Sequence, residues 1–177
     1  SSANVDEVIK KRLLEKTPEI KKSLESYYGE KETILKNLIS FTQGTAEMKS
    51  YSSAEGFSEV YPFVPYQFNL LQKVFDQIRI TGFTGKHLAK GERSMLSAFK
   101  ESTENLVDNS MGILVPFSDF YNSIESFLDP IIKRTIDHAK ANARLNEQDI
   151  KLLETLFLIK HIKEIKSNVD NLTVLSI

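Results

Sequence analysis

The sequence predicts an all-α protein, a helical bundle followed by the start of a helix-turn-helix-like segment. Apolar residues recur at steps of three and four along most of the chain, which is typical of helices with one buried face. Prolines and glycines occur where this period is interrupted, and no alternating strand pattern is seen. At 177 residues, of which 41% are hydrophobic, the chain is long enough to bury a core without disulfides or metals.

The first part of the chain is predicted to form three helices. Apolar residues at helical spacing indicate the first helix over 5–13. Thr17 is a suitable N-cap and Pro18 a suitable first helical residue, so a second helix is expected to begin there. Gly29 suits the left-handed residue that closes a helix, so we expect the second helix to end there and a third to cover 30–41.

A polar connection and an extended segment come next. Residues 42–58 contain two glycines and several serines and threonines, so this stretch is interpreted as a connection of uncertain structure. We group 1–58 as N-terminal helices with this connection. Residues 60–65 hold two prolines and are expected to be extended rather than helical.

Residues 59–145 form the second predicted region, a helical bundle. Helices are expected over 66–80 and over 91–107, and Ser118 is expected to cap another that reaches residue 128. The next helix should begin at Pro130, capped by the preceding aspartate. The apolar faces of these helices include Phe68, Leu71, Phe75, Met95, Leu96, Phe99, Phe120, Ile124, Ile131 and Ile136.

Residues 146–177 form the third predicted region. Asn146 and Asp149 resemble an N-terminal capping arrangement, which favours a helix to about His161. A turn and a second helix from about Ser167 give the pair a helix-turn-helix look, which Ile177 is expected to truncate. Acidic and basic residues nearly balance along the pair, which favours protein packing over DNA contact.

Composition excludes several classes of function. The chain has no cysteine, so disulfide frameworks, thiolate zinc sites, iron–sulfur clusters and a cysteine nucleophile are excluded. The formal net charge is −1, so no overall field attracts nucleic acid or an anionic membrane. The run from Gly82 to His87 superficially resembles a phosphate-binding loop, but its glycine spacing is wrong. We predict no catalytic residue and no metal ligand.

The chain starts without an initiator methionine and ends within an apolar pattern, so we expect a piece cut from a larger protein. No signal peptide and no apolar run of membrane-spanning length is found, which indicates a cytoplasmic location without membrane contact.

One local charge cluster stands out between residues 79 and 100. Five basic residues against one acidic residue give it a charge of +4. Gly91 and Arg93 lie where a helix is expected to begin, so backbone donors, the helix dipole and the guanidinium can converge on an anion. A solvated basic face is the competing interpretation. The basic residues of the candidate anion or partner face are Arg79, Lys86 and Lys90.

Four stretches resemble one known family. They are VYPFVPYQFNLLQKVF over 60–75, GKHLAKGERSMLSAF over 85–99, LLETLFLIKHIKEI over 152–165 and NVDNLTVL over 168–175. Together they are similar to the large P-loop ATPase of bacteriophage-exclusion (BREX) defence systems, the BrxC/PglY family. Residues before Val60 fit by continuity, with weaker motifs.

The resemblance implies that the parent protein is an AAA+-like ATPase that uses ATP and Mg²⁺, with its Walker motifs upstream. It implies that 59–145 is lid-like, and that Arg93, in a Gly-x-Arg setting with Gly91, acts as the phosphate-contacting "sensor 2" arginine. The implied partners are the upstream ATPase domain of the same chain, other BREX subunits and, for the parent, DNA. No cofactor is expected on this piece alone.

Two functions follow as hypotheses. In the first, this non-catalytic helical piece contributes to nucleotide sensing and assembly within an ATP-hydrolysing parent. In the second, it is a helical interaction module that binds another defence subunit or DNA, independently of nucleotide.

Overall fold

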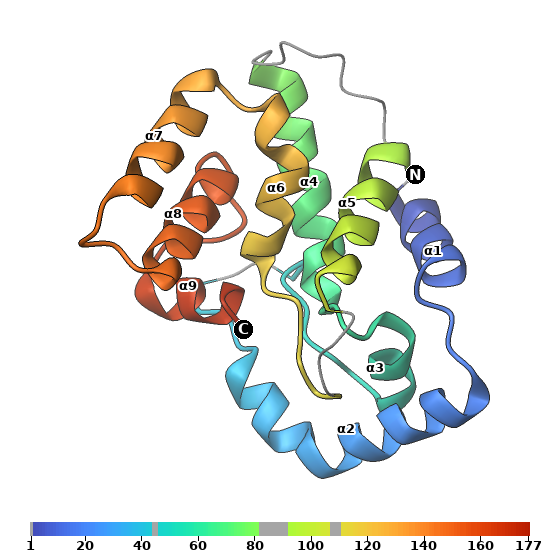
Figure 1. Ribbon diagram of the computed structural model, residues 1–177. Helices are drawn as coiled ribbons and strands as arrows, with labels where there is room; N and C mark the ends of the chain where they lie inside the picture. Colours follow the sequence, from blue (N-terminus) through green and yellow to red (C-terminus); the bar gives the residue numbers. More distant parts are fainter. Residues whose placement is uncertain (1, 44–45, 82–91, 107–110) are drawn as a thin grey trace.

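Helices make up every regular element in the part of the chain that the structure describes, as the sequence predicts. The computed structural model describes residues 2–43, 46–81, 92–106 and 111–177 (Figure 1). The elements are α1 (Ser2–Arg12), α2 (Pro18–Leu38), α3 (Ala54–Val60), α4 (Pro65–Thr81), α5 (Glu92–Glu104), the 3₁₀ helix η1 (Phe117–Phe120), α6 (Tyr121–Ile124), the 3₁₀ helix η2 (Glu125–Phe127), α7 (Pro130–Ala141), α8 (Glu147–Ile159) and α9 (Val169–Leu175). None of the helices in these ranges is both long and apolar enough to cross a bilayer.

α2 is one uninterrupted helix of 21 residues, so the predicted break at Gly29 is wrong. Thr17 caps its start as expected, because its hydroxyl accepts a hydrogen bond from the Ile20 backbone N–H at 3.3 Å. A Cβ atom added at Gly29 would meet nothing within 4 Å, so packing does not require glycine there. A glycine inside a helix costs only about 1 kcal/mol, which the flanking turns of α2 offset.

α3 lies within residues that the polar composition had assigned to an irregular connection. Ser53 caps it by accepting a hydrogen bond from the Gly56 N–H at 3.0 Å. Phe57 anchors it against α2, with its ring centroid 5.3 Å from that of Tyr28. A helix of seven residues is stabilised by such tertiary packing rather than by its own propensity, so its sequence carries little signal. The extended segment expected over 60–65 is a short turn between α3 and α4.

The core centres on aromatic rings carried by α4, α5 and η1, and α5 packs directly against η1 and α6. Phe99 of α5 is fully buried and its ring centroid lies 4.6 Å from those of Phe63 and Phe68. Phe120 of η1 stacks edge-on at 5.0 Å. The buried apolar residues form one cluster that extends from Val5 to Leu175.

The helix predicted over 118–128 is instead divided into η1, α6 and η2. Pro116 is the N-cap residue and offers no side-chain hydrogen bond, so the predicted cap at Ser118 is wrong. Backbone bonds spanning three residues, such as Asp119 N–H to Pro116 O at 3.1 Å, tighten this stretch.

The caps predicted for α7 and α8 are confirmed. Asp129 accepts a hydrogen bond from the Ile131 N–H at 2.9 Å. Asn146 and Asp149 form a reciprocal capping box, with both hydrogen bonds at 2.9 Å. α8 packs against α7, η1 and α9, and these helices lie on the side of the molecule opposite α1 (Figure 1).

Candidate functional site

The predicted basic cluster is only partly within the described residues. Lys86, Lys90 and Gly91 lie outside them. Arg79 lies in the last turn of α4, and Arg93 is the second residue of α5. Figure 1 shows the end of α4 and the start of α5 directed toward the same end of the molecule.

Arg79 has unused hydrogen-bonding capacity. Its Nη1 donates to the Asp76 carboxylate at 2.8 Å, one turn earlier on the same helix. Its Nε and Nη2 atoms are buried and have no acceptor among the described residues. Because a guanidinium favours planar oxyanions, these two donors suit a phosphate or carboxylate.

Arg93 is exposed in the first turn of α5 and has no ion pair with any described residue. The other face of the helix is anchored, since Met95, Ala98 and Phe99 are buried in the core. The backbone N–H groups of a first helical turn lack intrahelical acceptors and carry the positive end of the helix dipole. The described part of α5 therefore presents the exposed Arg93 on a helix that its buried face holds in place.

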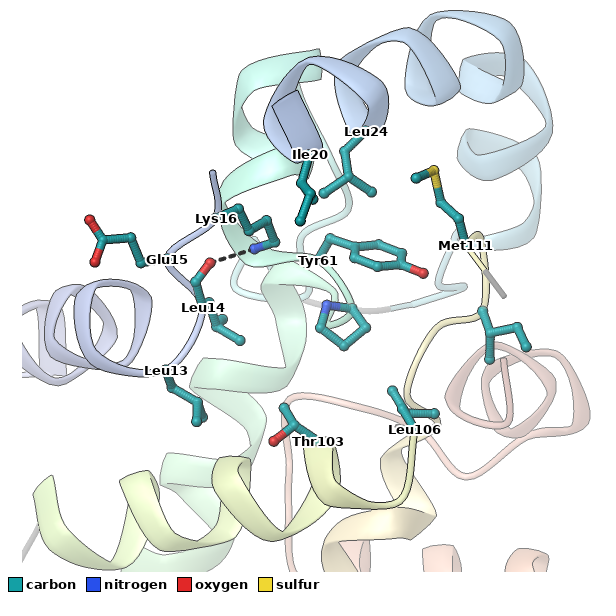
Figure 2. A pocket seen from close by; sticks show the side chains of 12 residues that line it. Leu13, Leu14, Glu15, Lys16, Ile20, Leu24, Tyr61, Thr103, Leu106 and Met111 are labelled. Atoms are coloured by element: carbon teal, nitrogen blue, oxygen red, sulfur yellow. Dashed lines mark hydrogen bonds between the residues drawn. The ribbon is translucent and has the colours of Figure 1, made fainter. Parts of the chain in front are cut away.

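A second candidate site is a pocket of about 350 Å³ near the other end of α5. Figure 2 shows Tyr61 and Lys16 bordering the same space, with Thr103 contributed by α5 and Leu106 by the residues that follow it. Four segments that are distant in sequence build it. The lining residues are Leu13, Leu14, Glu15, Lys16, Ile20, Leu24, Tyr61, Pro62, Thr103, Leu106, Met111 and Ile113.

Lys16 is the basic side chain in the described wall of this pocket. Its ammonium donates to the Leu14 carbonyl at 2.7 Å and, more weakly, to the Glu59 carbonyl at 3.4 Å near the end of α3. Burial lowers its pKa to about 8; the Glu59 carboxylate opposes this shift and Lys21 adds to it. The two carbonyls leave one N–H of the ammonium for a ligand. The pocket can therefore take an apolar group that carries a hydrogen-bond acceptor.

Sequence reasoning did not identify this pocket. Lys16 lies between Glu15 and Thr17, in a stretch that signals only the boundary between two helices. A lysine that is flanked by polar residues in the sequence is expected to be exposed to solvent. Its burial depends on contact with the end of α3, 43 residues away, and no local pattern reports such a contact.

The described residues contain no group of three or more histidine or carboxylate side chains placed to hold a metal ion. No protein-family model matches the chain, and no solved structure matches it.

Proposed function

We propose that this chain is a non-catalytic helical part of a BREX phage-defence ATPase of the BrxC/PglY type, in which it contributes to nucleotide sensing and assembly. The four stretches quoted above support this proposal. In the structure, the first stretch supplies most of α4. The second stretch ends within α5, whose first two residues are Glu92 and Arg93. The proposal includes a cytoplasmic location.

The observation that carries the proposal is the position of Arg93, exposed on the first turn of a helix whose opposite face is buried. A guanidinium beside the N-terminus of α5 favours phosphate oxygens through charge and through paired N–H donors. In the proposed parent, ATP and Mg²⁺ are held by the upstream ATPase domain, and Arg93 contacts the γ-phosphate. Loss of that phosphate on hydrolysis removes the contact and releases α5.

The test is Arg93→Ala in the full-length parent. We expect ATP turnover to fall by about tenfold to a hundredfold, because a charge-assisted contact to the transferred phosphate is removed. Arg93→Lys should be intermediate, since lysine keeps the charge but lacks the two-pronged donor geometry. Lys100→Ala, which removes an exposed cation from the same helix, is the matched control and should leave turnover unchanged. Unchanged turnover and nucleotide affinity in Arg93→Ala would contradict the proposal.

A second candidate function, an interaction module independent of nucleotide, is favoured by the outer face of α2. Ile34 and Leu38 lie one turn apart on that helix and are 52% and 45% exposed. Exposed apolar side chains that share a face are typical of protein-binding surfaces. For this candidate, Ile34→Glu with Leu38→Glu in the parent should abolish its association with another defence subunit while ATP turnover is kept. Loss of turnover without loss of association would favour the first function.

A further inference from the structure

A polar cavity of about 400 Å³ lies between η1, the end of α7 and the first half of α8. It is separate from the pocket at Lys16 and from the start of α5. Side chains able to donate or accept hydrogen bonds dominate its wall. The lining residues are Asn105, Ser118, Asp119, Asn122, Lys140, Leu145, Asn146, Glu147, Ile150, Lys151 and Glu154.

Glu154 is the unusual member of this wall. It is only 9% exposed, yet its carboxylate has no hydrogen bond and no ion pair with any described residue. Buried carboxylates are otherwise almost always paired or hydrogen-bonded, because an isolated charge is poorly solvated inside a protein. The fold therefore holds a carboxylate at the cavity with no direct hydrogen-bond or ion-pair partner, although Lys140 and Lys151 act on it from a longer distance.

Asp119 brings a second carboxylate to the cavity from a different element, η1. It is half-buried, and its carboxylate also lacks a hydrogen bond or ion pair within the described residues. Burial raises the pKa of Asp119, against the opposing effect of Lys151. Burial also raises the pKa of Glu154; Lys140 and Lys151 oppose this shift, and Glu125 and Asp119 add to it. In both cases burial outweighs the nearby lysines.

The charges along the wall leave one negative charge unbalanced. Lys151 lies 3.7 Å from Glu147, one turn away on α8, and these two offset each other. The remaining charges of the wall are one positive charge, on Lys140, which is exposed near the end of α7, and two negative charges, on Asp119 and Glu154. One additional positive charge would bring the cavity to neutrality.

We propose that this cavity binds an organic monocation rich in N–H donors, an ammonium or guanidinium group, between Asp119 and Glu154. Two carboxylates on separate elements suit a cation that donates to both. The amide oxygens of Asn105 and Asn122 offer further acceptors at the rim. The cavity is many times the volume of a bare metal ion, whereas a guanidinium with its alkyl stem occupies a larger share of it. This proposal does not depend on the nucleotide-sensing function.

The test is a titration of the full chain at pH 7.5, followed through the backbone NMR signals of α6 and α8. Methylguanidinium and methylammonium chloride are the probes, and tetramethylammonium chloride is the control that has the same charge but no N–H donor. We expect both probes to shift the signals of Asn122 and Ile150 with a dissociation constant on the order of millimolar, because such small ligands make few contacts. The control and equal NaCl should have little effect. Equal shifts with tetramethylammonium, or none with the probes, would overturn the proposal.

Variants locate the binding to the two carboxylates. Glu154→Gln and Asp119→Asn should each weaken methylguanidinium binding by about tenfold, because each removes a charge-assisted hydrogen bond. Asp137→Asn removes an exposed negative charge from α7, outside the cavity wall, and should leave binding unchanged. Lys140→Met should strengthen binding, since it removes a competing cation. Binding that survives in both Glu154→Gln and Asp119→Asn would overturn the assignment.

A final probe distinguishes the source of the cation. N-acetylarginine amide carries the same guanidinium on a protein-like stem. Saturation by this probe as well as by methylguanidinium would assign the cavity to an arginine side chain of a partner, and saturation by methylguanidinium alone would assign it to a small cation.

Discussion

Two buried polar side chains, Gln67 and Glu154, show how differently two regions of the molecule are built. Gln67 lies in the aromatic core and is completely buried. Its Oε1 accepts from the Val64 N–H at 2.9 Å, and its Nε2 donates to the Val115 carbonyl at 2.6 Å. Glu154, at the junction of α7 and α8, is nearly as buried and has no such partner.

The difference indicates what each region is for. In the core, the amide of Gln67 joins the start of α4 to the segment before η1, so its hydrogen bonds belong to the fold. At the α7–α8 edge, the carboxylate of Glu154 lines a cavity and has no hydrogen bond with any described residue. A carboxylate whose pKa is raised by burial and that lines a cavity is a candidate for a functional group. The predictions below test this contrast, beginning with the largest expected effect.

Phe99→Ala should destabilise the protein by about 3–5 kcal/mol, because it leaves a cavity among tightly packed rings. Phe157→Ala is the comparison at the other region: Phe157 is half-buried on α8, and its loss should cost about half as much or less. Denaturant unfolding followed by circular dichroism measures both. Equal losses would show that the two regions are packed alike.

Gln67→Ala should cost about 2–3 kcal/mol, since a buried N–H and a buried carbonyl both lose their partner. Gln72→Ala is the control, because that side chain only bonds Asp76 on the exposed surface of the same helix. Its expected cost is below about 0.5 kcal/mol. A small loss in Gln67→Ala, comparable to the control, would contradict a structural role for the amide.

Unlike the substitutions above, Glu154→Gln should stabilise the folded state, by about 1 kcal/mol at pH 7.5. This value is discounted because the carboxylate has partial access to solvent in the cavity. Burial, with Glu125 and Asp119, raises the pKa of Glu154 above its ordinary 4.5, while Lys140 and Lys151 oppose the shift.

The sign of the pH dependence follows from that raised pKa. The folded state holds the proton of Glu154 more tightly, so the carboxyl group is well accommodated below pH 4.5 and becomes unfavourable as the pH rises through its folded pKa. The advantage of Glu154→Gln should therefore vanish at pH 4. An advantage that is the same at both pH values would exclude the carboxylate charge as its cause.

Lys16→Met tests the pocket at the end of α5, and its effect should appear only at alkaline pH. The folded pKa of about 8 lies below the ordinary 10.5, so the folded state releases the proton more readily. Native stability should rise by about 1–2 kcal/mol between pH 8 and 10.5 relative to the variant, after allowance for solvent screening. Thermal unfolding across this range measures the slope. Parallel curves for the two proteins would contradict the lowered pKa.

Helix starts were predictable because their signals are local. Thr17, Asp129 and Asn146 each accept a hydrogen bond from a backbone N–H two or three residues later, so sequence spacing alone identifies them. The predicted helix end at Gly29 is wrong because the signal there is only permissive. A glycine allows a helix to end, whereas the packing of the turns on either side decides whether the helix does end.

The candidate sites were harder to predict than the helices. Arg93 was singled out because its spacing from Gly91 resembles a known motif, and its proposed role stays a prediction. Lys16, Asp119 and Glu154 gave no such signal, since each looks like an ordinary surface charge in its local stretch.

The sequence by itself determined the all-α class, most helix starts and the lack of cysteine chemistry, because periodicity, capping and composition are properties of neighbouring residues. Only the tertiary structure decided which charged side chains are withdrawn from solvent. Lys16 is covered by the end of α3, where it donates to a backbone carbonyl, and Asp119 and Glu154 line one cavity, although they come from separate elements. The desolvation that makes these groups chemically distinctive arises from contacts between segments far apart in the chain, and such contacts leave no periodic trace in it.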